Sequence, residues 1–149
     1  MNPCTKRHPN ARALILGSED YPDIHGEVLF YQEKCGVTVS AHIYGLPENE
    51  TGFFGFHIHD GSGCKGKGFP DSGMHYDPEG VPHPSHAGDL PPLLFSNGQA
   101  MLELCTDRFR VKDIIGKVII IHLNADDMTT QPSGNAGTKI ACGVIQRAA

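Results

Sequence analysis

An ordered series of metal-binding side chains runs through this 149-residue chain and constrains its fold more than any other feature. Six of the nine histidines belong to the series, together with one aspartate. Its members are His57, His59, His75, His83, His86, Asp89 and His122, and Asp126 follows the last of them by four positions. Imidazole suits zinc and copper, and a set this dense has few other uses. The pattern therefore predicts a site for one or two transition metals.

Short apolar runs with a period of two predict an all-β fold. Val37, Val39, Ala41 and Ile43, for example, fall on one face of a strand. Seven strands are predicted, at Ala11–Leu16, Gly26–Gln32, Val37–Tyr44, Phe53–His59, Gln99–Leu104, Lys117–Leu123 and Lys139–Gln146. We expect residues 1–149 to form one domain, a β-sandwich or flattened barrel of seven to eight antiparallel strands with two long functional loops.

The two predicted loops are Gly/Pro-rich or irregular stretches, at Asp60–Asn97 and Asn124–Thr138. A loop as long as the first, without regular structure, is normally either functional or disordered. This loop contains four of the metal-binding side chains, so a metal ion could supply order that local contacts do not.

Composition and charge exclude several classes of partner. The net charge of −5 leaves no basic stripe, so no nucleic-acid partner is expected. No apolar run of 18 residues occurs, so no membrane-spanning helix is expected. The N-terminal segment lacks a long apolar stretch, which predicts a cytoplasmic protein unless a leader has been trimmed. An odd number of cysteines leaves at least one thiol free.

The spacing of the ligands indicates how they divide between two ions. His57 and His59 leave the same face of a strand whose other face carries Phe54, Phe56 and Ile58, so the histidines should point outward beneath the long loop. Three imidazoles and a carboxylate match a closed tetrahedral zinc site, and these are His75, His83, His86 and Asp89. An all-imidazole site suited to copper remains at His57, His59 and His122. Both sites reach four ligands only if one residue is shared, and His75 is the candidate bridge.

Five segments of the chain resemble the copper/zinc superoxide dismutases. They are GFHIHD, SGMHYDP, HAGDL, IIIHLNADD and GNAGTKIACGVI, in collinear order between about Gly26 and Ile145. The resemblance implies a Greek-key β-sandwich and a superoxide dismutase that cycles copper(II) and copper(I) beside a structural zinc ion. It also implies that superoxide is the substrate. Members of the family are often homodimers, although the sequence itself does not reveal the oligomeric state.

The resemblance implies a role for each matching residue. His57, His59, His75 and His122 would bind copper, and His75, His83, His86 and Asp89 would bind zinc. Asp126 would hydrogen-bond one histidine ligand of each metal, which fixes the orientation of the rings. Cys64 and Cys142 would form a disulfide, which leaves Cys4, Cys35 and Cys105 surplus. His75 would carry a proton in the catalytic cycle, and Lys139 would attract the substrate anion.

The chain departs from the family pattern at the loops and at one cation. Lys139 stands where the family usually has arginine, so the charge is kept but the planar fork of donors is lost. This replacement predicts slower catalysis, without abolishing it. No charged residue lies between Asp127 and Lys139, which predicts weak electrostatic steering. These departures leave open an alternative function, a copper- or zinc-binding protein for storage or delivery with little turnover. A zinc hydrolase is a weaker alternative, because no H-E-x-x-H motif occurs.

Overall fold

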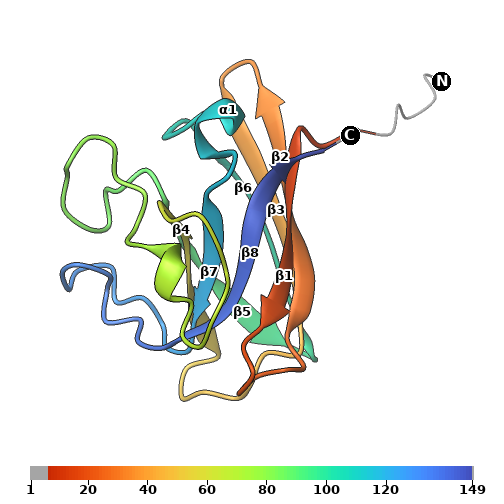
Figure 1. Ribbon diagram of the computed structural model, residues 1–149, viewed down its shortest axis with the longest axis vertical. Helices are drawn as coiled ribbons and strands as arrows, with labels where there is room; N and C mark the ends of the chain where they lie inside the picture. The colour runs from red at the N-terminus through yellow and green to blue at the C-terminus, as the bar shows by residue number, and fades with distance from the viewer. Residues whose placement is uncertain (1–6, 149) are drawn as a thin grey trace.

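Eight antiparallel strands form a closed barrel in the computed structural model, which describes residues 7–148. The strands are β1 (Ala11–Gly17), β2 (His25–Glu33), β3 (Gly36–Tyr44), β4 (Phe53–His59), β5 (Asp89–Ser96), β6 (Gln99–Thr106), β7 (Val118–His122) and β8 (Lys139–Arg147). Their order around the barrel is β1-β2-β3-β6-β5-β4-β7-β8, so the connections from β3 to β4 and from β6 to β7 skip neighbours, as in a Greek key. The predicted all-β class is confirmed (Figure 1).

One strand was missing from the prediction, because β5 lies inside the stretch expected to be a loop up to Asn97. Pro91 and Pro92 argue against a strand, since proline cannot donate to a β-ladder. In the structure both prolines fall where the pairing of β5 with β4 is interrupted by a shift in register, and neither has a partner there. The strand therefore tolerates them at an irregularity of the sheet.

The barrel interior and the outer face of β7 are both apolar. Ile119 and Ile121 point into the main core with the inward side chains of the other strands. Val118 and Ile120 point the opposite way and pack in a second cluster with Phe69 and Cys142. All five residues of β7 are buried, because both faces of this strand are covered. The second cluster gives the long loop an apolar surface on which to rest.

The two long loops lie on the same side of the barrel, next to β4 and β7 (Figure 1). The first follows β4 and contains a 3₁₀ turn at Pro70–Ser72, and the second connects β7 to β8. A short helix, α1 (Val111–Ile114), precedes β7. Within residues 7–148, no helix combines the length and apolarity needed to cross a membrane.

Backbone hydrogen bonds fasten the first loop to β4. The Ile58 N–H donates to the Gly88 carbonyl at 2.9 Å, and the Tyr76 N–H donates to the Ile58 carbonyl at 2.8 Å. A Cβ atom at Gly88 would lie 2.3 Å from the Ile58 oxygen, so glycine is what allows the loop to approach this closely. The loop thus extends the pairing along the β5 edge of β4, beside His57 and His59.

Candidate metal centre

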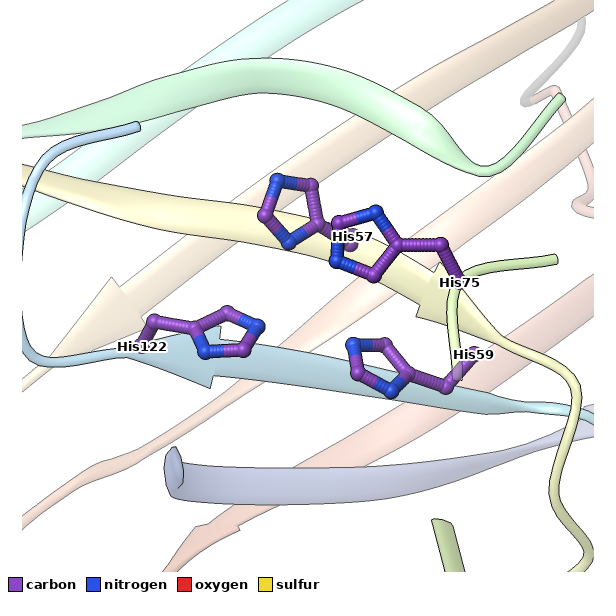
Figure 2. Close-up of side chains that lie close together, drawn as sticks. All are labelled: His57, His59, His75 and His122. Atoms are coloured by element: carbon purple, nitrogen blue, oxygen red, sulfur yellow. The ribbon is translucent and has the colours of Figure 1, made fainter. Parts of the chain in front are cut away.

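Four histidines from three segments of the chain converge between the barrel and the first loop. His57 and His59 come from β4, His122 ends β7, and His75 comes from the loop (Figure 2). One nitrogen of each ring lies within 4.8 Å of the corresponding atoms of the others. All four side chains are buried. The alternation of β4 and β7 places the rings of His57, His59 and His122 on the outward face, beneath the loop, as the sequence predicts for His57 and His59.

The second ring nitrogen of three of these histidines is held by an acceptor. The carboxylate of Asp126 accepts from His57 Nε2 at 2.7 Å, the Gly73 carbonyl accepts from His59 Nδ1 at 2.9 Å, and the Gly137 carbonyl accepts from His122 Nδ1 at 3.0 Å. Because carbonyl oxygens only accept, the protons of His59 and His122 must lie on Nδ1. Each ring therefore presents a bare nitrogen lone pair on its other side.

These bare nitrogens have no hydrogen-bond partner in the part of the chain that the structure describes. They are His57 Nδ1, His59 Nε2, His75 Nε2 and His122 Nε2. Leaving a buried polar atom unpaired costs about 1–3 kcal/mol, so four in one place require an explanation. A metal ion at their meeting point satisfies all four at once, and an all-imidazole set suits copper.

A second cluster surrounds the carboxylate of Asp89. Its oxygens lie 2.7 Å from His75 Nδ1, 3.0 Å from His83 Nδ1 and 3.1 Å from His86 Nδ1. His83 Nδ1 makes no hydrogen bond within residues 7–148 in spite of this short distance. His83 and Asp89 are thus close without bonding each other, which fits two ligands of a common ion. Three imidazoles and one carboxylate fit zinc, and His75 belongs to both clusters through its two nitrogens.

Asp126 links the two clusters from behind. Its Oδ2 accepts from His57 Nε2 and its Oδ1 accepts from His83 Nε2 at 2.8 Å. Burial raises the pKa of Asp126, but the hydrogen bonds from His57 and His83 outweigh burial and hold this pKa well below its usual range. The carboxylate is therefore ionised and orients one ring of each cluster.

Further contacts position the second cluster, and sequence reasoning did not find them. The Gln131 side chain accepts from the His83 N–H at 2.9 Å and donates to the His83 carbonyl at 2.7 Å. Arg108 Nη1 donates to the carbonyls of Pro84, at 2.8 Å, and His86, at 3.1 Å. These bonds tie the first loop to the second loop and to the segment after β6. Two other parts of the chain thus support the ligands in the first loop.

The implied disulfide is present and closes the base of the first loop. Cys64 in the loop is bonded to Cys142 in β8, 78 positions away. Cys142 belongs to the apolar cluster with Phe69 and Ile120. Cys35 and Cys105 are free and exposed, and Cys4 lies outside the described residues. The bond anchors the metal-binding loop to the barrel next to the site.

A cavity of about 440 Å³ opens above the first cluster. His59, His75 and His122 line it, and so does Lys139. Lys139 Nζ donates to Ser72 Oγ at 2.7 Å and to the Gly73 carbonyl at 3.2 Å. Burial lowers the pKa of Lys139 from its usual value. The cavity gives small molecules a path to three of the four histidines, past the ammonium group of Lys139.

The protonation of the buried histidines predicts a pH-dependent stability for the metal-free protein. Burial lowers the pKa of His59 to about 2 and that of His122 to about 3. The unfolded chain binds protons near pH 6.5, while the folded protein does not bind them until the pH is far lower. The contribution of these two rings to the free energy of unfolding is thus fully present above about pH 6.5. It is lost as the pH falls toward about pH 3, by up to about 1.4 kcal/mol per pH unit for each ring.

Urea unfolding of the metal-free protein between about pH 7 and about pH 5 checks this expectation. His122→Asn should make the decline with pH shallower. The matched control His42→Asn changes a ring that belongs to neither cluster and should leave the slope unchanged. An unfolding free energy that stays flat over this range would contradict the protonation states assigned here.

Sequence comparison places the chain among known proteins. A family model described as copper/zinc superoxide dismutase (SODC) matches residues 24–145. The chain is 37% identical to the copper-zinc superoxide dismutase of Legionella pneumophila over 142 residues, which cover 90% of this chain and 85% of that protein. It is 31% identical to the copper-zinc superoxide dismutase of Deinococcus radiodurans over 159 aligned positions, which cover 93% of this chain and 85% of that protein. These matches span most of the sequence, and they agree with the barrel and the two histidine clusters. The chain belongs to the copper/zinc superoxide dismutase family.

Proposed function

We propose that the two buried clusters bind the copper and zinc cofactors of this superoxide dismutase. The proposed copper ligands are His57, His59, His75 and His122, and the proposed zinc ligands are His75, His83, His86 and Asp89. The observation that carries this assignment is the set of unpaired ring nitrogens, which share one meeting point although they are buried. Family membership favours dismutation over the metal-storage alternative.

The reaction converts two superoxide anions and two protons into dioxygen and hydrogen peroxide. Copper, when bound, supplies the one-electron redox couple that this reaction needs. The protein holds the four imidazoles in place through Asp126, Gly73 and Gly137, and it leaves the cavity open above them. The zinc set has four protein ligands, which matches a structural site without an open position.

His75 is proposed to carry a proton between the substrate and the solvent. Its Nδ1 lies beside the Asp89 carboxylate and its Nε2 faces the other three histidines. The side chain also lines the cavity through which the substrate would arrive. Asp89 fixes the ring from the Nδ1 side, so Nε2, when it is not engaged by copper, would be the atom at which a proton is taken up and released.

Lys139 is proposed to attract superoxide into the cavity. It is the single cationic residue among those lining the cavity, where Asp60 and Asp77 are also present. We expect Lys139→Ala to lower kcat/KM by about tenfold, because one charge near the site steers an anion into the cavity. Lys139→Arg should keep or raise the rate, because it retains the charge and restores the planar fork of donors. Stopped-flow measurements at several salt concentrations check this, since salt screens steering.

Lys112→Ala is the matched control, because Lys112 lies on α1 and does not line the cavity. This variant should keep the salt dependence of the parent protein. If Lys139→Ala retained both the rate and its salt dependence, Lys139 would have no part in steering.

The direct test is reconstitution with copper and zinc, followed by activity and metal analysis on the same sample. Dismutase activity that depends on copper supports the proposal. One copper and one zinc ion per chain with negligible turnover would instead support the storage alternative. The homodimer common in the family and the cytoplasmic location expected from the sequence stay predictions, which the molar mass in solution and cell fractionation would test.

A further inference from the structure

An exposed methionine lies at the mouth of the copper cavity. Met74 is 65% exposed and lines the cavity together with His59, His75 and His122. It is not part of either apolar cluster, so packing does not account for it. A thioether is a soft ligand that selects copper(I) over harder cations. The position of Met74 in this lining would allow its sulfur to contact a metal ion that enters the site.

Hydrogen bonds fix the backbone of Met74 relative to the histidines. The Met74 N–H donates to Asp60 Oδ1 at 3.1 Å, and the Asp60 N–H donates to the Met74 carbonyl at 2.8 Å. Asp60 directly follows His59, and Met74 directly precedes His75. His59 and His75 themselves form an isolated β-bridge. The backbone that carries the thioether is therefore anchored at the point where two of the proposed copper ligands enter the site.

The cavity also offers the next ligands that an entering ion would meet. Among the residues that the structure describes, His59 Nε2 and His122 Nε2 have no hydrogen-bond partner, and these two histidines are only 2% and 4% exposed. The cavity lining includes two carboxylates, Asp60 and Asp77, against the single ammonium of Lys139. Its formal charge therefore does not oppose a monovalent cation. The exposed Met74 and the buried His59 and His122 thus line one cavity.

We propose that the Met74 thioether is an entry ligand for copper(I), which binds the ion at the cavity mouth before His59 and His122 take it over. The inference rests on the proposed copper site, since those histidines are the destination. The step is a ligand exchange in which the ion keeps its oxidation state. The thioether is neutral whether or not it holds the ion, so transfer to neutral imidazoles needs no proton.

The test measures the rate of copper uptake by the zinc-loaded protein. Copper(I) is supplied from its bicinchoninate complex under nitrogen, and the loss of the complex's colour reports the transfer. Met74→Leu keeps the size and apolar character of the side chain but removes the sulfur. We expect it to slow copper(I) uptake about tenfold, the lower end of what losing an auxiliary partner costs a metal site. The final copper content should equal that of the parent protein.

Met101→Leu is a close control, because Met101 is 67% exposed but lies on β6 and does not line the cavity. It should leave the uptake rate unchanged. Uptake of copper(II), which prefers nitrogen and oxygen ligands, should be equally fast in both variants and the parent. Equal copper(I) rates for Met74→Leu and the parent would overturn the inference. If the parent itself acquired no copper, the proposed copper site would fail instead.

Discussion

Replacing His122 by alanine is expected to lower copper affinity and dismutase activity by about 100-fold or more. Even partners outside the coordination sphere cost a metal site about 10–100-fold when they are lost. His122 supplies one of the four unpaired nitrogens, and the Gly137 carbonyl holds its ring in place. Zinc content should be unchanged, because His122 belongs to the first cluster alone. Metal analysis and activity on the same sample measure both effects.

Two further variants make this result specific. His86→Ala removes a member of the second cluster alone and should lower zinc content while copper still binds. His42→Ala removes a histidine on β3 that bonds Gln99 and belongs to neither cluster, so both metals and the activity should be retained. Unchanged copper affinity in His122→Ala, measured by competition with a chelator, would refute the ligand assignment. Loss of both metals in every variant would indicate damage to the fold, which thermal unfolding would reveal.

Strands with regular alternation could be predicted from the sequence, because burying one face imposes a period of two. β3 shows this clearly, since Val37, Val39, Ala41 and Ile43 are buried as predicted. β5 could not be found in the same way, because its prolines break the pattern. The signal that was overlooked is Asn97-Gly98, which joins β5 to β6 with positive φ at both residues, as two-residue hairpin turns require.

The types of the candidate ligands were predictable, but the contacts that orient them were not. Histidine is recognisable in the sequence as a common metal ligand, so the members of both clusters could be identified by residue type. The acceptors for His59 and His122 are the backbone carbonyls of Gly73 and Gly137, and every residue has a carbonyl. Only the fold determines which carbonyl lies within reach of a ring nitrogen.

Contacts between loops are hidden from sequence reasoning for a related reason. Gln131 holds both backbone groups of His83 across a separation of 48 residues. No sequence pattern predicts that a glutamine in a polar loop will hydrogen-bond a distant backbone. Its role depends on the two long loops lying side by side, which follows from the order of β4, β7 and β8 in the barrel. Such residues become visible only once the topology is known.

Removing the disulfide should have the largest effect on stability. In the chain-entropy model, cross-linking residues 78 positions apart contributes roughly 4–5 kcal/mol by restricting the unfolded chain. The variant that carries both Cys64→Ser and Cys142→Ala should lose about this much free energy of unfolding in the metal-free state. Alanine is chosen at position 142 because Cys142 is buried and a serine hydroxyl there would lack an obvious partner.

The loss should also reach the metal centre, because the disulfide anchors the first loop over the apolar cluster of Phe69, Val118 and Ile120. The loop carries His75, His83 and His86, so its release should weaken zinc binding as well as folding. Cys105→Ser is the control, since Cys105 is a free, exposed thiol, and it should change the unfolding free energy by less than about 0.5 kcal/mol. Urea unfolding of all variants measures the first effect, and competition with a zinc chelator measures the second. Unchanged zinc affinity together with reduced stability would mean that the hydrogen bonds from β4, Gln131 and Arg108 hold the loop without the disulfide.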